Sequence, residues 1–432
     1  MPLRLDASAP GFEKEFSAFL GRNRDTDENV DRVVAGIVAD VRARGDAAVV
    51  DYTAKFDWPG ITAENMRLSD AERSAAAAKV PAAQREALAF AAKRIEAFHR
   101  ALLPKDVDFT DSTGTRLGAR YRPVDAAGVY VPGGTAAYPS SVLMNIVPAK
   151  VAGVRRIVMV VPTPGGTLNP LVMLAAEIAG ADEVWRIGGA QAVAALAYGT
   201  QSIRPVDKIT GPGNAYVAAA KRRVFGQVGI DLIAGPSEIL VVADRHNDPQ
   251  WIAADLLSQA EHDPSSQSVL IADDAAFADA VVRAVEVELE TLDRAEIAGA
   301  SWRDNGAVIL VRDLADAPPI VDAIAAEHVE LAMEMAEAEA LSQKIRHAGA
   351  IFLGRHTPEA IGDYVAGTNH VLPTSRAARF SGGLGVADFL KRTSLVACTP
   401  QSLAALGPSA LALAEAEGLG AHGRSVSLRL GR

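Results

Sequence analysis

Short apolar runs alternate with longer helical patterns from about residue 128 onward. The β-branched runs are GVYV, RIVMVV, EVWRI and VDKIT, and the helical patterns between them are PSSVLMNIVPAKVAG, NPLVMLAAEIAG and GAQAVAALAYG. Most of the short runs are nearly continuous in apolar residues, which is typical of strands buried on both faces. Strands that alternate with helices in this way predict a parallel sheet.

A second set of the same kind follows the turn AGPSE. Its apolar runs are ILVVAD, SVLIAD, AVILV and GAIFL, again separated by helical patterns. We therefore predict the α/β fold class, with two parallel-sheet halves joined near residues 234–238. The repetition is one of architecture, because the sequence itself has no repeat of fixed period.

Helical patterns dominate before the first strand. Thr26 can cap a helix that Gly45 ends, and the helix has an apolar stripe at helical spacing. The stripe consists of Val30, Val33, Val34, Ile37, Val38 and Val41. A second, alanine-rich helical pattern runs from about residue 69 to 99.

The alternation stops after residue 354. Residues 354–385 are rich in Gly, Thr, Ser and Arg, and a loop of that length in a compact protein is usually functional or disordered. Its apolar residues, such as Tyr364 and Phe380, favour a functional loop. The tail then predicts one helix over about 401–417 and a short closing strand, SVSLRL.

Composition narrows the class of protein. The chain has 432 residues, is 49% hydrophobic and 22% charged, and carries a net charge of −10. This suits a globular protein of two or more domains, and the acidic balance argues against nucleic acid or an anionic membrane as partner. Its apolar runs are too short to span a membrane, and the N-terminal residues lack the apolar core of a secretory signal. These features predict a cytoplasmic protein.

Gln259 and His262 form the first candidate site. They lie three residues apart in DLLSQAEH, at the end of an apolar helical pattern, so a helix would place them on one face. The alternative to a metal site is an ordinary helix end, where a histidine cation meets the helix dipole. Because Cys398 is the only cysteine, a metal here would need nitrogen and oxygen ligands. Glutamine is an uncommon zinc ligand, so the pair alone is a weak metal signal.

Glu327 and His328 form the second candidate site. A carboxylate next to an imidazole suits general acid–base chemistry near neutral pH, and the alternative is a solvated helix end. Two further histidines, His370 and His422, lie in glycine-bearing segments of the last quarter of the chain.

Three glycine turns each follow a predicted strand and precede a predicted helix. They are VPGGT at 131–135, IGGAQA at 187–192 and GPGNAY at 211–216. Backbone amides and helix N-termini gather at this edge of a parallel sheet, so each turn is either a ligand contact or a tight connection. None has the G-x-G-x-x-G spacing of the usual dinucleotide fingerprint.

Taken together, these segments resemble the histidinol dehydrogenase family. The resemblance covers about residues 130–389 and continues through the tail AEAEGLGAHGRSVSLRL. The motifs, in order, are YVPGGTAAYPSSVLMNIVPAKVAGV, GGAQAVAALAYGT, GPGNAYV, IDLIAGPSEILVVAD, DLLSQAEH, AEHVEL, GDYVAGTNHVLPT and GLGVADF. The family oxidises L-histidinol to L-histidine in two NAD-dependent steps through an aldehyde, at the end of histidine biosynthesis.

The resemblance implies a zinc site in a homodimer whose C-terminal tails are exchanged. Gln259, His262 and Asp363 would be ligands from one chain, and His422 would be the fourth, from the other subunit. The zinc ion would hold the imidazole and amine of the substrate instead of activating water.

The resemblance also assigns the remaining roles. His328 would be the base for the hydroxyl proton, and Glu327 would activate the water that adds to the aldehyde. Ser237 and Glu417 would contact substrate, as would His328 and the zinc ligands. The NAD contacts would be Tyr130, Gln191 and Asn214.

The expected domains are two incomplete Rossmann-like units with small terminal segments. The N-terminal segment covers 1–25, one unit combines 26–129 with 238–384, the NAD-side unit covers 130–237, and the exchanged tail covers 385–432. Two rivals to histidinol oxidation remain. The first is a family sibling that oxidises another small alcohol, such as a sulfonated propanediol, and the second is a zinc-bound structural protein without turnover.

Overall fold

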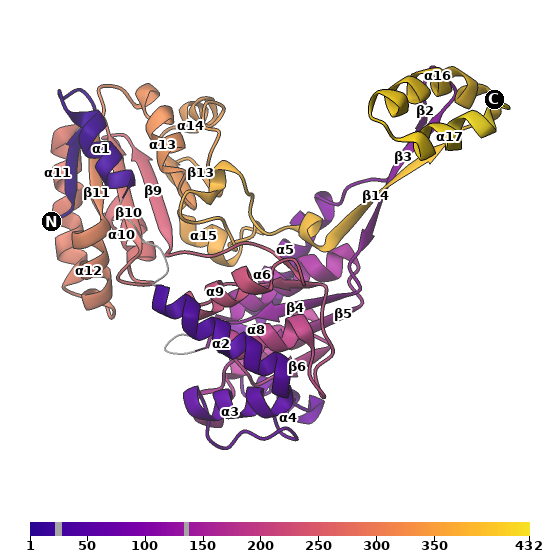
Figure 1. Cartoon of the computed structure of the whole chain (residues 1–432). Helices are drawn as coiled ribbons and strands as arrows, with labels where there is room; N and C mark the ends of the chain where they lie inside the picture. The colour runs from indigo at the N-terminus through magenta and orange to yellow at the C-terminus, as the bar shows by residue number, and fades with distance from the viewer. Residues whose placement is uncertain (22–27, 134–137) are drawn as a thin grey trace.

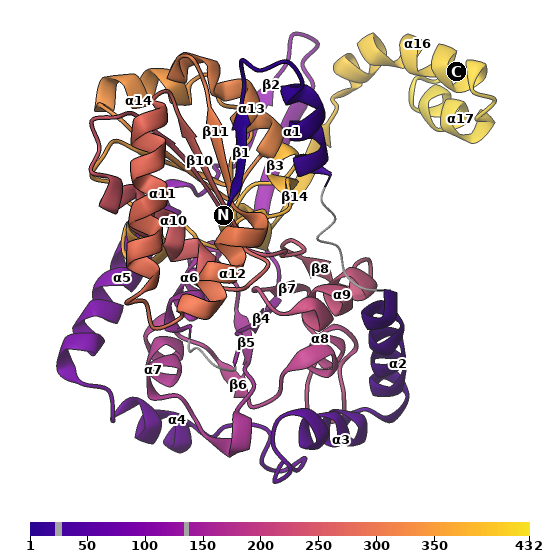
Figure 2. The same cartoon turned by 90° about the vertical axis from the view of Figure 1, so that its left-hand side faces the viewer.

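The computed structural model describes residues 1–21, 28–133 and 138–432. Two parallel sheets each lie between layers of helices, and an arm of strands and helices extends away from both (Figures 1 and 2). The predicted α/β class with two parallel-sheet halves is therefore confirmed. The chain passes from one half to the other between β8 (Gly229–Ile230) and β9 (Glu238–Ala243), where the AGPSE turn predicted the boundary.

The six-stranded sheet has the order β1-β11-β10-β9-β12-β13, with parallel neighbours. Alternate residues of β9 enter different cores: Ile239 and Val241 pack against α10–α12, and Leu240 and Val242 against α1, α13 and α14. Both faces are covered, which explains the uninterrupted apolar run. The other elements are β1 (Leu3–Asp6), β10 (Gln267–Ala272), β11 (Ala307–Leu310), β12 (His328–Ala332), β13 (Ala350–Leu353), α1 (Phe12–Leu20), α10 (Pro249–Ala260), α11 (Ala275–Leu289), α12 (Ala295–Asn305), α13 (Pro318–Ile324), α14 (Met335–Ser342) and α15 (Glu359–Tyr364).

The five-stranded sheet has the order β6-β5-β4-β7-β8, also parallel. Its two faces are covered by α4–α7 on one side and by α2, α3, α8 and α9 on the other. The other strands are β4 (Ala126–Tyr130), β5 (Arg156–Val160), β6 (Glu183–Trp185) and β7 (Lys208–Thr210). The helices are α2 (Glu28–Arg44), α3 (Asp46–Phe56), α4 (Asp70–Ala77), α5 (Ala82–Ala101), α6 (Pro139–Ala152), α7 (Pro170–Ala179), α8 (Gly189–Tyr198) and α9 (Ala215–Val224).

The N-terminal part of the predicted domain division differs from the observed packing. The β1 strand of the N-terminal segment is an edge strand of the six-stranded sheet, paired with β11. Helices α2–α5 were expected beside residues 238–384, yet they pack on the five-stranded sheet. The predicted stripe is real, since Val34 and Val38 share a core with Val158 of β5, but a stripe does not specify which sheet it covers.

The predicted ends of these helices fare differently. Gly45 follows the last residue of α2 and has a φ of 60°, a backbone conformation that favours glycine, so this predicted end is confirmed. The proposed cap at Thr26 lies outside the described residues. The helical pattern at 69–99 is two helices, because α4 ends at Ala77 and Pro81 immediately precedes α5.

The arm combines segments that are far apart in the sequence. Strand β14 (Leu390–Ala397) pairs antiparallel with β3 (Arg116–Pro123), which pairs with β2 (Val107–Thr110). The strands lead to α16 (Pro400–Ala416) and α17 (Gly420–Arg429), away from both parallel sheets (Figure 1).

The tail prediction is half correct. The helix expected over 401–417 is α16, but the closing strand is wrong because SVSLRL belongs to α17 and the residue after it. The apolar residues Val426, Leu428 and Leu430 alternate as in a strand. However, the Leu430 side chain packs against Gly407 of α16, where an added Cβ would lie 2.6 Å from Leu430 Cδ1. Packing between the two helices therefore decides the structure. Among the described residues, no helix is long and apolar enough to span a bilayer.

Candidate active site

Glu327 and His328 lie at the amino end of the six-stranded sheet, where β12 begins between β9 and β13. They are only 7% and 2% exposed, so the alternative of a solvated helix end is wrong. Glu327 Oε2 accepts a hydrogen bond of 3.0 Å from the Glu238 backbone N–H. The Nδ1 of His328 is 3.1 Å from the Glu238 carbonyl oxygen. The backbone of β9 therefore holds both side chains in place.

The contact with a carbonyl oxygen also fixes the proton of His328. Because a carbonyl only accepts, Nδ1 must carry the hydrogen, and Nε2 of the neutral ring keeps its lone pair. This Nε2 is buried without a hydrogen-bond partner and lies 3.5 Å from Asp363 Oδ1. The basic atom of the pair is therefore directed at a residue that the sequence proposed as a metal ligand.

Gln259 and His262 are brought together, although not as one helix face. Helix α10 ends at Ala260, so Gln259 lies in its last turn and His262 follows the end. A turn holds them together, with the His262 backbone N–H donating to the Gln259 carbonyl at 3.2 Å. The Nδ1 of His262 is 3.2 Å from the Ser237 hydroxyl, which places that predicted substrate residue in the same cluster.

Asp363 reaches the cluster from α15. Its carboxylate neighbours His328, and its backbone oxygen is 3.0 Å from Nδ1 of His370. Ligand atoms of His328, Glu359 and Asp363 lie within 4.8 Å of one another, which identifies them as a group able to hold a cation. The long loop expected to be functional thus supplies Asp363 through a short helix.

Residues that the sequence did not single out as ligands complete the cluster. Glu359 is 1% exposed and accepts hydrogen bonds from Gln259 Nε2 and the Ser258 hydroxyl. His370 Nε2 is 3.1 Å from the Ser141 hydroxyl at the start of α6. Glu359 lies four residues before Asp363 on one helix, a spacing that could have indicated a shared face.

The donor set fits a metal ion. Gln259 Oε1, Asp363 Oδ1 and His328 Nε2 are buried without hydrogen-bond partners, which is costly unless something else satisfies them. An amide oxygen, a carboxylate oxygen and the imidazole of His262 are nitrogen and oxygen donors suited to Zn²⁺ or Mn²⁺. The residues present therefore fit the zinc ion that the resemblance implies.

Burial and neighbouring charges shift the pKa values of several groups in the cluster. Burial raises the pKa of the Glu327 carboxyl. Burial alone would lower the pKa of His328, but the carboxylates of Glu327 and Asp363 outweigh it and raise that pKa. For Asp363, burial is opposed by its contact with His328 and by the charge of His370, and its pKa is lowered. Burial lowers the pKa of His262, which favours the neutral ring that a metal requires.

The residues expected to contact NAD lie at the carboxyl edge of the five-stranded sheet. Tyr130 ends β4, Gln191 lies in the first turn of α8, and Asn214 caps α9. Tyr130 and Gln191 are buried, and the Tyr130 hydroxyl accepts from the Gly189 N–H at 3.0 Å. Asn214 is exposed at the helix N-terminus. The three assignments stay predictions.

Two of the glycine turns have a packing reason. Gly211 has a φ of 110°, and a Cβ there would lie 2.0 Å from the Tyr130 backbone oxygen. A Cβ on Gly188 would lie 2.6 Å from Pro162. Close packing, against backbone at Gly211 and against the Pro162 ring at Gly188, therefore favours glycine at both positions whether or not a ligand binds. Residues 134 and 135 of the turn VPGGT lie outside the described residues.

The two edges face each other. Asn369 donates to the Met144 carbonyl of α6 at 2.6 Å, and the Ser141–His370 contact joins the same elements. Helix α6 follows β4, so its start marks the carboxyl edge of the five-stranded sheet. The amino edge of the six-stranded sheet therefore meets the carboxyl edge of the other.

Glu417 and His422 lie elsewhere. Glu417 follows α16 and His422 lies on α17, both exposed on the arm (Figure 1). A single chain thus brings together Ser237, Gln259, His262, Glu327, His328 and Asp363, but not these two.

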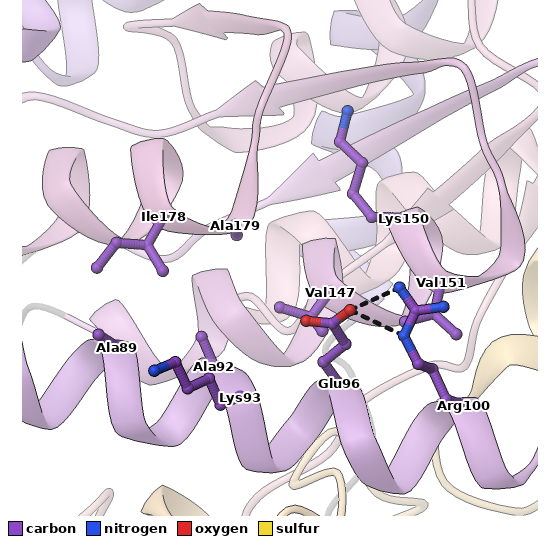
Figure 3. Close-up of a pocket in the computed structure, with 10 residues that line it drawn as sticks. All are labelled: Ala89, Ala92, Lys93, Glu96, Arg100, Val147, Lys150, Val151, Ile178 and Ala179. Atoms are coloured by element: carbon purple, nitrogen blue, oxygen red, sulfur yellow. Dashed lines mark hydrogen bonds and ion pairs between the residues drawn. The ribbon is translucent and has the colours of Figure 1, made fainter.

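A separate cavity of about 290 Å³ lies between α5, α6 and α7 (Figure 3). Two of its cations are paired within the chain: Arg100 binds Glu96, and Lys150 binds Asp182. None of the predicted site residues lines it. We assign no chemistry to this cavity.

The fold and the cluster define an α/β enzyme with a buried acid–base pair beside a candidate metal site. Comparison with known proteins specifies the class further. A sequence model of histidinol dehydrogenase matches residues 20–430. The chain is 65% identical to the histidinol dehydrogenase of Rhodospirillum rubrum and 63% identical to that of Ruegeria pomeroyi, covering 100% of this chain and 99% of each relative.

A solved structure agrees. Histidinol dehydrogenase from Elizabethkingia anophelis superposes with a TM-score of 0.94 at 35% identity, over 100% of this chain and 98% of that one. The chain belongs to the histidinol dehydrogenase family, and it is therefore an oxidoreductase.

Proposed function

We propose that this protein is a zinc- and NAD-dependent enzyme that oxidises L-histidinol to L-histidine through the aldehyde, in the last steps of histidine biosynthesis in the cytoplasm. The observation that carries the proposal is the position of His328. Its Nδ1 is held by the Glu238 carbonyl, and its unpartnered Nε2 is 3.5 Å from Asp363, beside Gln259 and His262. A base is thus fixed next to a place where a substrate can be held.

Zinc bound by Gln259, His262, Asp363 and His422 of the partner subunit would orient the imidazole and amine of the substrate, and NAD would accept the hydride. The chain's own residues handle the protons. His328 Nε2 takes the hydroxyl proton as the carbon hydrogen leaves, which produces the aldehyde. His328 can do so only with a neutral ring, and positive charge beside Asp363 favours that form.

The second oxidation needs water on the aldehyde carbon. Glu327 removes a proton from that water, and its raised pKa suits a carboxylate that must hold a proton near neutral pH. The hydrate would then pass its carbon hydrogen as hydride to a second NAD and its hydroxyl proton to His328, giving the acid. Cys398 is exposed on the arm and takes no part in these reaction steps. The aldehyde is oxidised as its hydrate and not as a thiohemiacetal.

The NAD side of the proposal rests on the facing edges. The carboxyl edge of a parallel sheet is the usual place for such a ligand, and here it adjoins the acid–base pair. Tyr130 ends β4, Gln191 follows β6 and Asn214 follows β7, so all three lie at this edge.

Exchange of the arm between two subunits would complete the site. The arm exposes apolar side chains near the two remote residues, Leu413 at 64% and Leu419 at 42%. Helix α15 exposes Ile361 and Tyr364 on either side of Asp363. Two apolar surfaces, each next to one part of the predicted ligand set, support docking of one chain's arm on the other's α15. Truncation before Glu415 should then abolish activity while both parallel sheets stay folded.

The experiment that tests the reaction counts NADH. Purified, zinc-loaded protein should form two NADH per L-histidinol consumed, with histidine as product. Turnover of a sulfonated propanediol but not of histidinol would favour the sibling activity, and no turnover of either would favour a structural zinc protein. We prefer histidinol because Glu417 is an anionic partner for an amine and would repel a sulfonate.

A further inference from the structure

We infer that Glu359 is a positioning residue that turns the oxygen of the Gln259 side-chain amide toward the metal. The inference rests on the proposed zinc site and concerns how an uncommon ligand is oriented. Oxygen and nitrogen of a glutamine amide have nearly the same shape, so its neighbours must decide which atom faces the ion.

The hydrogen bonds settle the orientation of the amide. Gln259 Nε2 is 2.7 Å from Glu359 Oε1, and Gln259 Oε1 is buried without a partner. If the amide were turned over, two oxygens that both accept would meet at that distance and repel. The carboxylate therefore selects the orientation in which the ligand oxygen is left for a cation.

This selection holds for an ionised Glu359 and for a Glu359 protonated at Oε2. Glu359 Oε2 is 2.8 Å from the Ser258 hydroxyl, which is also 2.7 Å from the Asp255 carbonyl. An ionised Glu359 accepts the hydroxyl hydrogen at Oε2. A protonated Glu359 donates from Oε2 to Ser258, which then donates to Asp255. With no proton, or with the proton on Oε2, Oε1 stays an acceptor for Gln259.

The backbone also holds Glu359 in place. Its N–H donates to a carboxylate oxygen of Glu330 in β12, which is itself 3% exposed. Glu359 is thus tied to the strand that carries His328 and to the helix that carries Gln259. Glu359 therefore links the orientation of the Gln259 amide to β12, the strand that begins with His328.

The test compares two substitutions in the full-length protein. Glu359→Leu removes the acceptor, whereas Glu359→Gln keeps a carbonyl oxygen for Gln259 and an amide that can donate to Ser258. Zinc affinity, measured by competition with a chromogenic chelator, should fall about 10- to 100-fold in E359L and stay within about threefold in E359Q. Glu359→Met, which also lacks an acceptor, serves if E359L does not fold.

Two further measurements decide the case. Adding Glu359→Leu to Gln259→Leu should change zinc affinity little, because the two changes remove one interaction. Metal-free E359L leaves the buried Gln259 Nε2 without an acceptor and should melt below E359Q, so both zinc affinities are measured at a temperature where circular dichroism shows each variant folded. An unchanged zinc affinity in E359L overturns the inference. An equal loss of zinc affinity in E359Q also overturns it, because Glu359 would then act through its negative charge or as a metal ligand. Absence of zinc binding by the unaltered protein would instead refute the proposed function.

Discussion

The candidate site residues of the two parallel sheets lie at opposite edges, the amino edge of one sheet and the carboxyl edge of the other. The six-stranded sheet carries Glu327, His328 and Ser237 at the amino ends of β12 and β9, with the candidate metal ligands beside them. The five-stranded sheet presents glycine turns and helix N-termini at its carboxyl edge, and charged residues there, such as Asp231, are paired within the chain. The first edge gathers titratable side chains and candidate metal ligands, whereas the second consists of backbone amides and short turns. If the proposed function is correct, the usual rule that ligands bind at carboxyl edges holds for only one of the two sheets.

One strand shows the contrast within a few residues. The amino end of β9 is next to Ser237 and Glu238, which hold parts of the cluster. The carboxyl end of β9 is followed by Asp244, which binds Arg355 through two hydrogen bonds. The amino end of β9 therefore adjoins a cluster in which His328 Nε2 and Gln259 Oε1 have no hydrogen-bond partner. Its carboxyl end is followed by an ion pair whose hydrogen bonds are formed.

The strongest test of this contrast is removal of the acid–base pair. His328→Asn should lower the rates of both oxidations by about 10²- to 10⁴-fold, since both need the same base. Glu327→Gln should slow aldehyde oxidation more than alcohol oxidation, because only the former consumes water. The rates are measured separately with histidinol and with the aldehyde. Equal loss in both half-reactions of Glu327→Gln would count against the water-activating role.

The next test addresses the arm. Asp363→Ala and His422→Ala should each be inactive alone, since each removes a proposed ligand from every site. If arms are exchanged, a mixed dimer has one intact site and one doubly altered site. Unfolding and refolding the two variants together at equal amounts should restore about a quarter of normal activity. Activity that stays at the level of the separate variants would show that both residues serve the same chain's site.

A substitution at the carboxyl edge of the five-stranded sheet should affect NAD binding and leave zinc binding unchanged. Asn214 Oδ1 accepts from the N–H groups of Tyr216 and Val217, so Asn214→Ala should cost about 1 kcal/mol of stability as a lost helix cap. It should also raise KM for NAD, by about tenfold, which corresponds to one lost hydrogen bond. Zinc affinity should not change.

Asn169→Ala is the matched control. Asn169 caps α7 on the same sheet through the same two contacts, to Leu171 and Val172. It should lose similar stability and keep its KM for NAD. A KM that rises equally in both variants would reduce the role of Asn214 to capping.

The sequence predicted the class of fold and most of the strands because strands buried on both faces leave a continuous apolar run. It could not place α2–α5, since an apolar stripe such as Val34 and Val38 reports burial and not the identity of the covering sheet. It also mistook part of α17 for a strand, because the contact of Leu430 with Gly407 is tertiary.

The candidate site shows the same limits. Local spacing left Gln259 and His262 as a weak signal, and the end of α10 at Ala260 removes the shared helix face on which that signal rested. Resemblance to the family, and not spacing, selected Asp363. Glu359 escaped notice because its role depends on which amide atom faces it, and a sequence does not contain that information.

The smallest expected effect concerns the carboxyl end of β9. Burial alone would raise the pKa of Asp244, but the hydrogen bonds from Arg355 and the His246 N–H outweigh it and lower the pKa. A group whose pKa is lower in the folded state stabilises the fold above its unfolded pKa, about 3.9, and loses that contribution as the pH falls. Asp244→Asn should therefore destabilise the protein by about 1–3 kcal/mol at pH 7, and the difference should shrink below about pH 4. Urea unfolding at both pH values measures this, while kcat at pH 7 should stay unchanged. A loss of kcat without loss of stability would mean that this end of β9 also takes part in the reaction, and the contrast between the two ends would fail.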